Sequence, residues 1–504
     1  MPRPSAGRLV ALLVLGGMLL RLVLAAVLPP GYDEAYYLFY GQHLDLSFFD
    51  HPPAVGLFAW FGVHLGGSIL ALRLASLLSY SAALVLLASA TRRWFGPSAS
   101  VLAVLIASLS PLLLLCGGVL LLPDAPLLLL LAVLLWWLSR HPSAVPETAP
   151  QALQLGLILG GLTLCKYHAL LVLVSLLAYA LTQPQASVRF RQPWPWLALL
   201  IWGLSSSPLW IWNQAHGWTS FVFHAGRTDA ESGFHWLGPP LFLLAQLGLL
   251  FPCIGLVLLL ALCGRSEPGD PRQGPRRLLR WLVLPQLVLF CLLAGRMHVL
   301  ASWLVPAWWM TLPLAAAWLQ DRLGQGRRRY RLAMASSQLI VPLLLAVGAL
   351  QVRWGVLDRW LPPGLDASAQ LMPVQELRRS LQAHPAIWRQ LREAELISST
   401  RYDLPGFLAL ALGRDTRAAF TTFSRDPRGF RVWQPRDGYQ GRRGVLFSIH
   451  DPNKPLTSRR FPSAVGPLQP LGLIVVHRAG KPALTLEFSG FGPLRGPFPR
   501  PGSA

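Results

Sequence analysis

The chain has 504 residues, of which 53% are hydrophobic and only 13% charged, and its formal net charge is +22. This composition excludes an ordinary water-soluble globular protein. The apolar residues form continuous Leu, Ala and Val runs without the alternating period of barrel strands. We therefore predict a polytopic α-helical membrane protein.

About eleven segments have the length and hydropathy of membrane helices, which need roughly 20 apolar residues each. The first is predicted to be an uncleaved anchor, because its apolar stretch is long for a signal peptide and contains Arg21. The stretch 152–182 has two interpretations. It forms either a hairpin around Lys166 or one long membrane segment, which would place every later loop on the opposite side of the membrane. The predicted spans are 8–28, 69–91, 98–117, 124–139, 152–165, 167–182, 195–213, 238–262, 279–294, 299–319 and 332–350.

The distribution of arginine favours the hairpin and a cytoplasmic N-terminus. Connections on the cytoplasmic side would carry most arginines of the first 350 residues, including the cluster 327–331, while the opposite connections carry Lys166, Arg227 and Arg296. Membrane proteins show this asymmetry because positive loops stay in the cytoplasm. Much of the net charge thus reports topology, and no nucleic-acid partner is predicted.

The composition changes after about residue 351, where long apolar runs stop and Arg, Gly and Pro become frequent. We predict a transmembrane domain at 1–350, a soluble α/β domain at 351–488 outside the cytoplasm, and a disordered tail at 489–504. The helical period covers 374–396. The predicted strands are Leu396 to Ser398, Gly444 to Ile449, Gly472 to Val476 and Leu484 to Phe488.

The first outer loop is acidic, with Asp33, Glu34, Asp45 and Asp50 and no Lys or Arg between residues 29 and 68. A helix along the membrane interface is predicted from Asp33 onward, with its tyrosines at headgroup depth. Consecutive helical residues point about 100° apart, so only one of Asp33 and Glu34 can face a cavity. The alternative for Asp33 is a helix N-cap after Pro-Pro-Gly.

Two further acids are candidate site residues. Asp124, in Leu-Pro-Asp-Ala-Pro, precedes a membrane helix and is either a site acid or another helix-capping residue. Asp50 and His51 precede Pro52, which favours an extended, stiff loop. A carboxylate there could bind a metal and an imidazole a phosphate, and the alternative is a rigid surface turn.

Basic and aromatic residues follow on the same predicted side of the membrane. Lys166, one of three lysines, is either a phosphate ligand or a snorkelling interfacial residue. The fourth outer loop combines tryptophans with Asn, His and Arg, which suit sugar stacking and phosphate binding, although an aromatic belt and surface imidazoles explain them equally. The candidate ligands here are Tyr167, Trp212, Asn213, Trp218, His224 and Arg227.

The order of these motifs resembles a known family. Asp-Glu at the loop helix, Asp-His-Pro-Pro, Pro-Asp-Ala-Pro-Leu, Lys-Tyr, and Trp-Asn before Gly-Trp-Thr-Ser-Phe are similar to the bacterial protein O-mannosyltransferase-like glycosyltransferases. These belong to the C-type superfamily, which includes the aminoarabinose transferases acting on lipid A. The resemblance covers roughly residues 20–300.

The resemblance implies inverting sugar transfer from a polyprenyl (undecaprenyl) phosphate donor to a lipid or glycan acceptor at the periplasmic face of a bacterial inner membrane. Asp33 matches the acid regarded as the catalytic base, and Asp124 matches a second site acid. Asp50 and His224 match the two ligands of a divalent metal, zinc or magnesium. His51 stands where the family has a phosphate-binding lysine, a departure that leaves the phosphate ligand open, with Lys166, Arg73 and Arg227 as substitutes.

Two other classes of function compete with a transferase. A transporter or lipid flippase also needs many helices, but such proteins place ionisable residues near the midplane and often show repeats, which this sequence lacks. A membrane-anchored binding protein would need a site in the soluble tail, where the sequence shows no cluster of candidate residues.

Overall fold

The protein is described by a computed structural model at residues 5–226, 233–264, 269–361, 366, 368, 371–459, 461, 463–478 and 481–498. The chain divides into two compact units. The helical unit comprises Met1–Val23, His51–Val55 and Leu74–Leu345, and the mixed unit comprises Leu24–Asp50, Gly56–Arg73 and Ala346–Ala504. The mixed unit takes in most of the first outer loop as well as the C-terminal part of the chain.

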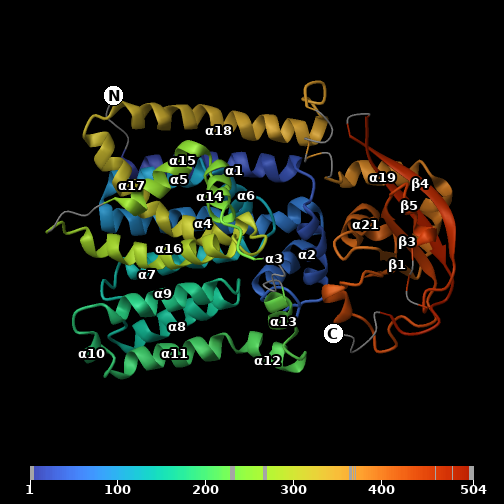
Figure 1. Cartoon of the computed structure of the whole chain (residues 1–504), viewed down its shortest axis with the longest axis horizontal. Coiled ribbons are helices and arrows are strands. Elements are labelled where there is room, and N and C mark those ends of the chain that lie inside the picture. The colour runs from blue at the N-terminus through green and yellow to red at the C-terminus, as the bar shows by residue number, and fades with distance from the viewer. Residues whose placement is uncertain are drawn as a thin grey trace. The chain divides into compact units, whose positions relative to one another are not determined.

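The helical unit contains helices throughout the part of it that is described (Figure 1). α1, α4 and α18 extend beyond this unit at one end. The other helices pack mainly through Leu, Ala and Trp side chains. Their bounds are α1 Ala6–Val27, α4 Ile69–Phe95, α5 Pro97–Ser108, α6 Pro111–Gly118, α7 Asp124–Leu138, α8 Ala149–Thr163, α9 Ala169–Leu181, α10 Ala186–Arg189, α11 Pro193–Ser205, α12 Ser207–Ala215, α13 Thr219–Gly226, α14 Gly238–Leu249, α15 Pro252–Cys263, α16 Gln273–Leu293, α17 Val305–Gly324 and α18 Arg328–Trp354.

The count of eleven membrane spans is not confirmed. Among the described residues, α1, α4 and α18 are long and apolar enough to cross a membrane, and the pair α5 and α6, bent by 79°, could form a fourth span. Several predicted spans are interrupted instead of continuous. The segment predicted at 195–213 is split between α11 and α12, and that at 238–262 is split before Pro252, which cannot donate a helical hydrogen bond.

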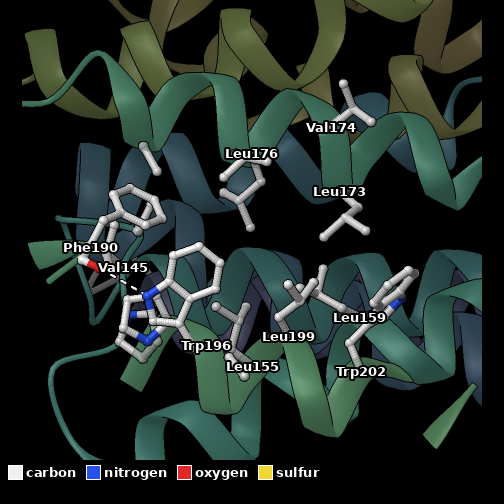
Figure 2. Close-up of a pocket in the computed structure, with 16 residues that line it drawn as sticks. Val145, Leu155, Leu159, Leu173, Val174, Leu176, Phe190, Trp196, Leu199 and Trp202 are labelled. Atoms are coloured by element: carbon white, nitrogen blue, oxygen red, sulfur yellow. Dashed lines mark hydrogen bonds between the residues drawn. The ribbon is translucent and has the colours of Figure 1, made fainter. Parts of the chain in front are cut away.

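The hairpin interpretation of 152–182 is confirmed, because α8 ends at Thr163 and α9 begins at Ala169. Figure 2 shows the two helices side by side and antiparallel, with Leu155 opposite Leu176 and Leu159 opposite Leu173. α11 also packs on α8. A Cβ atom at Gly160 would overlap with Ser205 Oγ, so glycine permits this close approach of the two helices.

The mixed unit contains a five-stranded sheet with the order β2-β1-β3-β5-β4. β1 pairs in parallel with β2 and β3, while β5 runs antiparallel between β3 and β4. The small α/β domain is thus confirmed. The four predicted strands all form, β2 was missed, and the helix predicted at 374–396 is broken before Pro385. The strands are β1 Leu396–Ser399, β2 Ala419–Thr422, β3 Gly444–Ile449, β4 Leu468–Arg478 and β5 Lys481–Phe491, and the helices are α2 Tyr32–Gln42, α3 Ala54–His64, α19 Val374–Gln382, α20 Pro385–Glu393 and α21 Pro405–Leu412.

The helix of the first outer loop, α2, belongs to the core of this unit. Ala35 is fully buried with the side chains of α21 and the sheet. A Cβ atom at Gly406 would lie 1.9 Å from the backbone oxygen of Ala35, so the two helices approach at backbone contact. The tyrosines of α2, predicted at headgroup depth, instead pack on the C-terminal part of the chain, for example Tyr36 on Trp433.

The predicted disorder of the tail is wrong for residues 489–498. β5 continues to Phe491, and the backbone of Leu494 exchanges hydrogen bonds with Gly441 and Arg442. Leu494 and Phe498 are buried in a second small core. The Gly and Pro content suggested disorder, but these apolar side chains bury enough surface to order the segment. Residues 499–504 lie outside the described part.

Candidate active site

The first turn of α2 separates the two neighbouring acids Asp33 and Glu34. Asp33 is exposed, whereas Glu34 is 1% exposed. The expectation that they face different directions is confirmed. Gly31, not Asp33, is the N-cap residue of α2, and its N–H donates to Glu34 Oε2 at 2.9 Å. The N-cap interpretation of Asp33 is therefore wrong.

Glu34 forms a buried ion pair with Arg73. Nε and Nη2 of Arg73 donate to the two carboxylate oxygens at 2.8 and 2.6 Å. The remaining N–H groups of Arg73 donate to the backbone oxygens of Ala25, Leu28 and Pro29 at 2.8 to 3.0 Å. A guanidinium has five N–H donors, so all of them are used. This arrangement leaves Arg73 no donor for a phosphate, and we remove it from the candidate phosphate ligands.

Asp50 lies at the centre of a second polar cluster in the mixed unit. Its side chain is 3% exposed and pairs with Arg428, with 2.8 Å between Nη1 and Oδ2. The hydroxyl of Tyr40 makes a short hydrogen bond to Oδ1, and that of Tyr36 lies 3.5 Å from the same oxygen. Arg428 also lies 3.6 Å above the ring of Tyr402.

Charges in this cluster shift the titration of its members. Burial raises the pKa of Tyr402, the positive charge of Arg428 opposes this shift, and Asp33 adds to it. Burial lowers the pKa of Arg428, but the Asp50 carboxylate and other neighbours outweigh it and the net shift is upward. Both side chains therefore keep their usual protonation states near neutral pH. Asp33 and Arg428 both interact electrostatically with Tyr402.

The contacts of Asp50 do not fit the predicted metal ligand. One carboxylate oxygen accepts from Arg428 and the other from Tyr40, so a guanidinium already balances the negative charge. In the described parts of the chain no group of three or more His, Cys, Asp and Glu side chains is placed to hold a metal ion. His224, the second predicted ligand, lies in α13.

In the helical unit, Asp124 and Lys166 form a buried ion pair. Nζ of Lys166 lies 2.9 and 3.0 Å from the two oxygens of Asp124 and 3.3 Å from the backbone oxygen of Ser302. Both side chains are at most 6% exposed, so Lys166 does not snorkel. The N-cap residue of α7 is Pro123, so Asp124 is not that cap. The three ammonium donors are all used here, and a phosphate would have to displace Asp124 to bind Lys166.

Imidazole and aromatic rings gather around the turn between α8 and α9. His168 is near enough to Lys166, His51 and His224 to interact with them electrostatically. The ring of Tyr167 packs edge-on against His224, with centroids 5.0 Å apart, and against Phe221. The structure thus brings two predicted phosphate ligands, His51 and Lys166, close to Tyr167 and His224. Tyr167 is a predicted donor ligand and His224 a predicted metal ligand.

The tryptophans of the fourth outer loop divide into buried and exposed groups. Trp212 is buried and stacks on His216, while Trp218 is 47% exposed and contacts Phe221. Asn213 is fully buried. Its amide donates to the oxygen of Leu209, and its Oδ1 has no hydrogen-bond partner among the residues described. Trp218 is thus the more accessible ring for a sugar, and Arg227 lies outside the described residues.

An apolar groove runs between α8, α9 and α11 (Figure 2). It has a volume of about 270 Å³ and is lined by aliphatic side chains and by Phe190, Trp196 and Trp202. The groove follows the α8–α9 hairpin from Leu159 and Leu173 to Ala144 and Phe190.

Comparisons with known proteins show which family and which fold this chain is similar to. A model of the dolichyl-phosphate-mannose-protein mannosyltransferase family matches residues 50–212. The fold is similar to that of ArnT from Cupriavidus metallidurans bound to undecaprenyl phosphate, with a TM-score of 0.62, 17% identity and coverage of 95% of this chain and 97% of that one. The predicted resemblance is confirmed.

Further structural similarities lie within the C-type glycosyltransferase fold. The apo state of the same ArnT gives a TM-score of 0.61 at 14% identity, covering 95% and 97% of the two chains. Arabinofuranosyltransferase AftD from Mycobacteria gives 0.51 at 15% identity, covering 98% of this chain and 41% of that one. No match was found among curated protein sequences. The chain has the C-type fold, with a helical membrane part and a small C-terminal sheet.

The contribution of the C-terminal part to the cluster around Asp50 could not be predicted from the sequence. Arg428 and Tyr402 stand in loops without a recognisable motif. Tyr36 and Tyr40 carried a signal, because residues four apart share a helix face, but they were interpreted as interfacial aromatics. The sequence therefore pointed to the acids of the site and not to the partners of Asp50.

Proposed function

We propose that this protein transfers a sugar from a polyprenyl-phosphate-linked donor to a hydroxyl group of a lipid or glycan acceptor, with inversion, at the periplasmic face of a bacterial inner membrane. The observation that carries the proposal is the exposed carboxylate of Asp33 beside a buried and ion-paired Glu34. The C-type fold and the match to the mannosyltransferase family favour this function over a transporter or flippase.

The chemistry needs a base, an activated donor and a site for the lipid. An acceptor hydroxyl is a weak nucleophile, and a carboxylate that takes its proton in the transition state accelerates transfer by about 10²- to 10⁴-fold. We assign this role to Asp33. The leaving polyprenyl phosphate gains negative charge, and nearby cations stabilise it. His51 and Lys166 are the proposed phosphate ligands, and the phosphate takes the place of Asp124 at the ammonium group of Lys166.

The remaining site residues are assigned by their surroundings. Trp218 and Tyr167 offer rings on which a sugar can stack, and Asn213 offers a buried amide oxygen to a hydroxyl. The apolar groove between α8, α9 and α11 suits part of a polyprenyl tail, because hydrocarbon is stabilised where it leaves water or fills a void. ArnT provides a precedent, since its structure holds undecaprenyl phosphate.

The proposed topology has eleven membrane crossings, the N-terminus in the cytoplasm and the sheet of the mixed unit in the periplasm. The α8–α9 hairpin supports it, because a single long segment there would place the sheet on the other side. Interrupted pairs such as α11 with α12 are long enough together to cross a bilayer.

Mass analysis of envelope glycolipids tests the function directly. Cells with the protein should contain a glycolipid or glycan that is heavier by one sugar than in cells lacking it, and the Asp33→Asn variant should match the deletion. Identical glycolipid and glycan profiles with and without the protein would contradict the proposal.

A further inference from the structure

The loop that carries Arg428 is held in a conformation that an ordinary surface loop would avoid. Arg428 has a φ of +44°, in the left-handed region that non-glycine residues rarely adopt. The next N–H, of Gly429, donates to the hydroxyl of Tyr36 at 2.9 Å. A Cβ atom at Gly429 would lie 2.4 Å from the ring of Trp433, so only glycine fits there. Strained backbone of this kind persists only where surrounding contacts enforce it.

These contacts direct the guanidinium onto one carboxylate. Arg428 is 11% exposed and lies over the Tyr402 ring while Nη1 reaches Oδ2 of Asp50. A buried carboxylate needs a compensating charge and hydrogen bonds, and Asp50 receives both from Arg428 and Tyr40. The C-terminal part of the chain thus supplies the cation for an acid of the first outer loop.

A divalent metal at Asp50 would have to compete with this guanidinium. The metal would need the same oxygen lone pairs, and it would lie at close range to a positive charge that cannot be deprotonated. We propose that Arg428 is the positioning residue that holds Asp50 and takes the place of a metal ion there, so that the cluster around Asp50 binds no divalent cation. This inference goes beyond the proposed function and does not depend on it.

The test uses the full-length protein in detergent and two readouts. These are metal content after incubation with zinc or magnesium and desalting, and the melting temperature with and without EDTA. The variants are Arg428→Gln, Arg428→Lys and, as a matched control, Arg425→Gln, which removes an exposed arginine of the same loop.

Wild type should hold far less than one metal ion per chain, and EDTA should not change its melting temperature. Arg428→Gln leaves the Asp50 charge uncompensated, and we expect a lower melting temperature, with partial recovery when zinc is added. Arg428→Lys should lower the melting temperature less than Arg428→Gln does, and Arg425→Gln should match wild type.

A wild-type protein that retains one metal ion per chain, or melts at a lower temperature in EDTA, would overturn the inference and leave the proposed function intact. Equal melting temperatures of Arg428→Gln and Arg425→Gln would overturn it too. If Arg428→Gln does not fold, the double variant Asp50→Asn/Arg428→Gln removes both charges and should fold.

Discussion

The two carboxylate oxygens of Glu34 accept hydrogen bonds from Nε and Nη2 of Arg73 at 2.8 and 2.6 Å, while the side chain of the preceding residue, Asp33, is exposed. One turn of helix therefore holds a structural acid and a candidate catalytic acid. Substitutions at the two positions should have different effects on stability and on transfer.

Breaking the Glu34–Arg73 pair should destabilise the protein. Removing one partner of a buried pair leaves an uncompensated charge, which typically costs about 3 to 5 kcal/mol. Arg73→Met should therefore lower the melting temperature strongly, and Glu34→Gln/Arg73→Met should recover part of the loss. Thermal unfolding followed by tryptophan fluorescence measures both. A single variant as stable as wild type would show that the pair contributes little.

The Asp124–Lys166 pair should behave similarly in the helical unit. Lys166→Met leaves Asp124 charged among apolar helices, so we expect greater destabilisation from this single change than from Asp124→Asn/Lys166→Met. The double variant should fold yet bind undecaprenyl phosphate less well than wild type if Lys166 contacts the phosphate. Undiminished lipid binding by a folded double variant would exclude Lys166 as a phosphate ligand.

The pH dependence of stability should include Asp366 of the mixed unit. Burial raises the pKa of this carboxyl, but hydrogen bonds from Ser368, Arg478 and Gln351 outweigh it and lower the pKa to about 2, from 3.8. A lowered folded-state pKa stabilises the protein above pH 3.8, and this contribution is lost as the pH falls through 2.

Asp366→Asn should therefore lower the melting temperature at pH 7, and its difference from wild type should shrink below pH 4. Asp437→Asn, at an exposed acid of the same unit, serves as the control. If the melting temperatures of Asp366→Asn and wild type differ by the same amount from pH 7 to pH 3, the hydrogen bonds of Asp366 do not favour the charged carboxylate.

The proposed topology predicts the location of two segments. Reporter fusions should place residues 327–331 in the cytoplasm and residue 400 outside, because the arginine asymmetry and the α8–α9 hairpin both support that orientation. Labelling of residue 400 from the cytoplasm would contradict the proposal of eleven membrane crossings and the proposed location of the site at the periplasmic face.

The sequence was most informative where one local rule decides the structure. Apolar runs predicted the helices, and the 100° helical step correctly separated Asp33 from Glu34. Ion pairs between residues that are far apart in the sequence leave no local sequence pattern. Nothing near Glu34 indicates that Arg73, 39 positions away, is its partner, and Arg428 is 378 positions from Asp50. The tail was misjudged because Gly and Pro content does not report that Leu494 and Phe498 find a core.

The transfer rate of Asp33→Asn decides whether Asp33 is the catalytic base. Asn keeps the shape of this exposed side chain and can still accept hydrogen bonds, so folding and donor binding should match wild type. Without a base, transfer should fall by about two to four orders of magnitude, while Asp45→Asn, at another exposed acid of the loop, should be near wild type. Transfer by Asp33→Asn within a few-fold of wild type, at equal donor binding, would contradict the assignment and leave Asp124 as the leading candidate base.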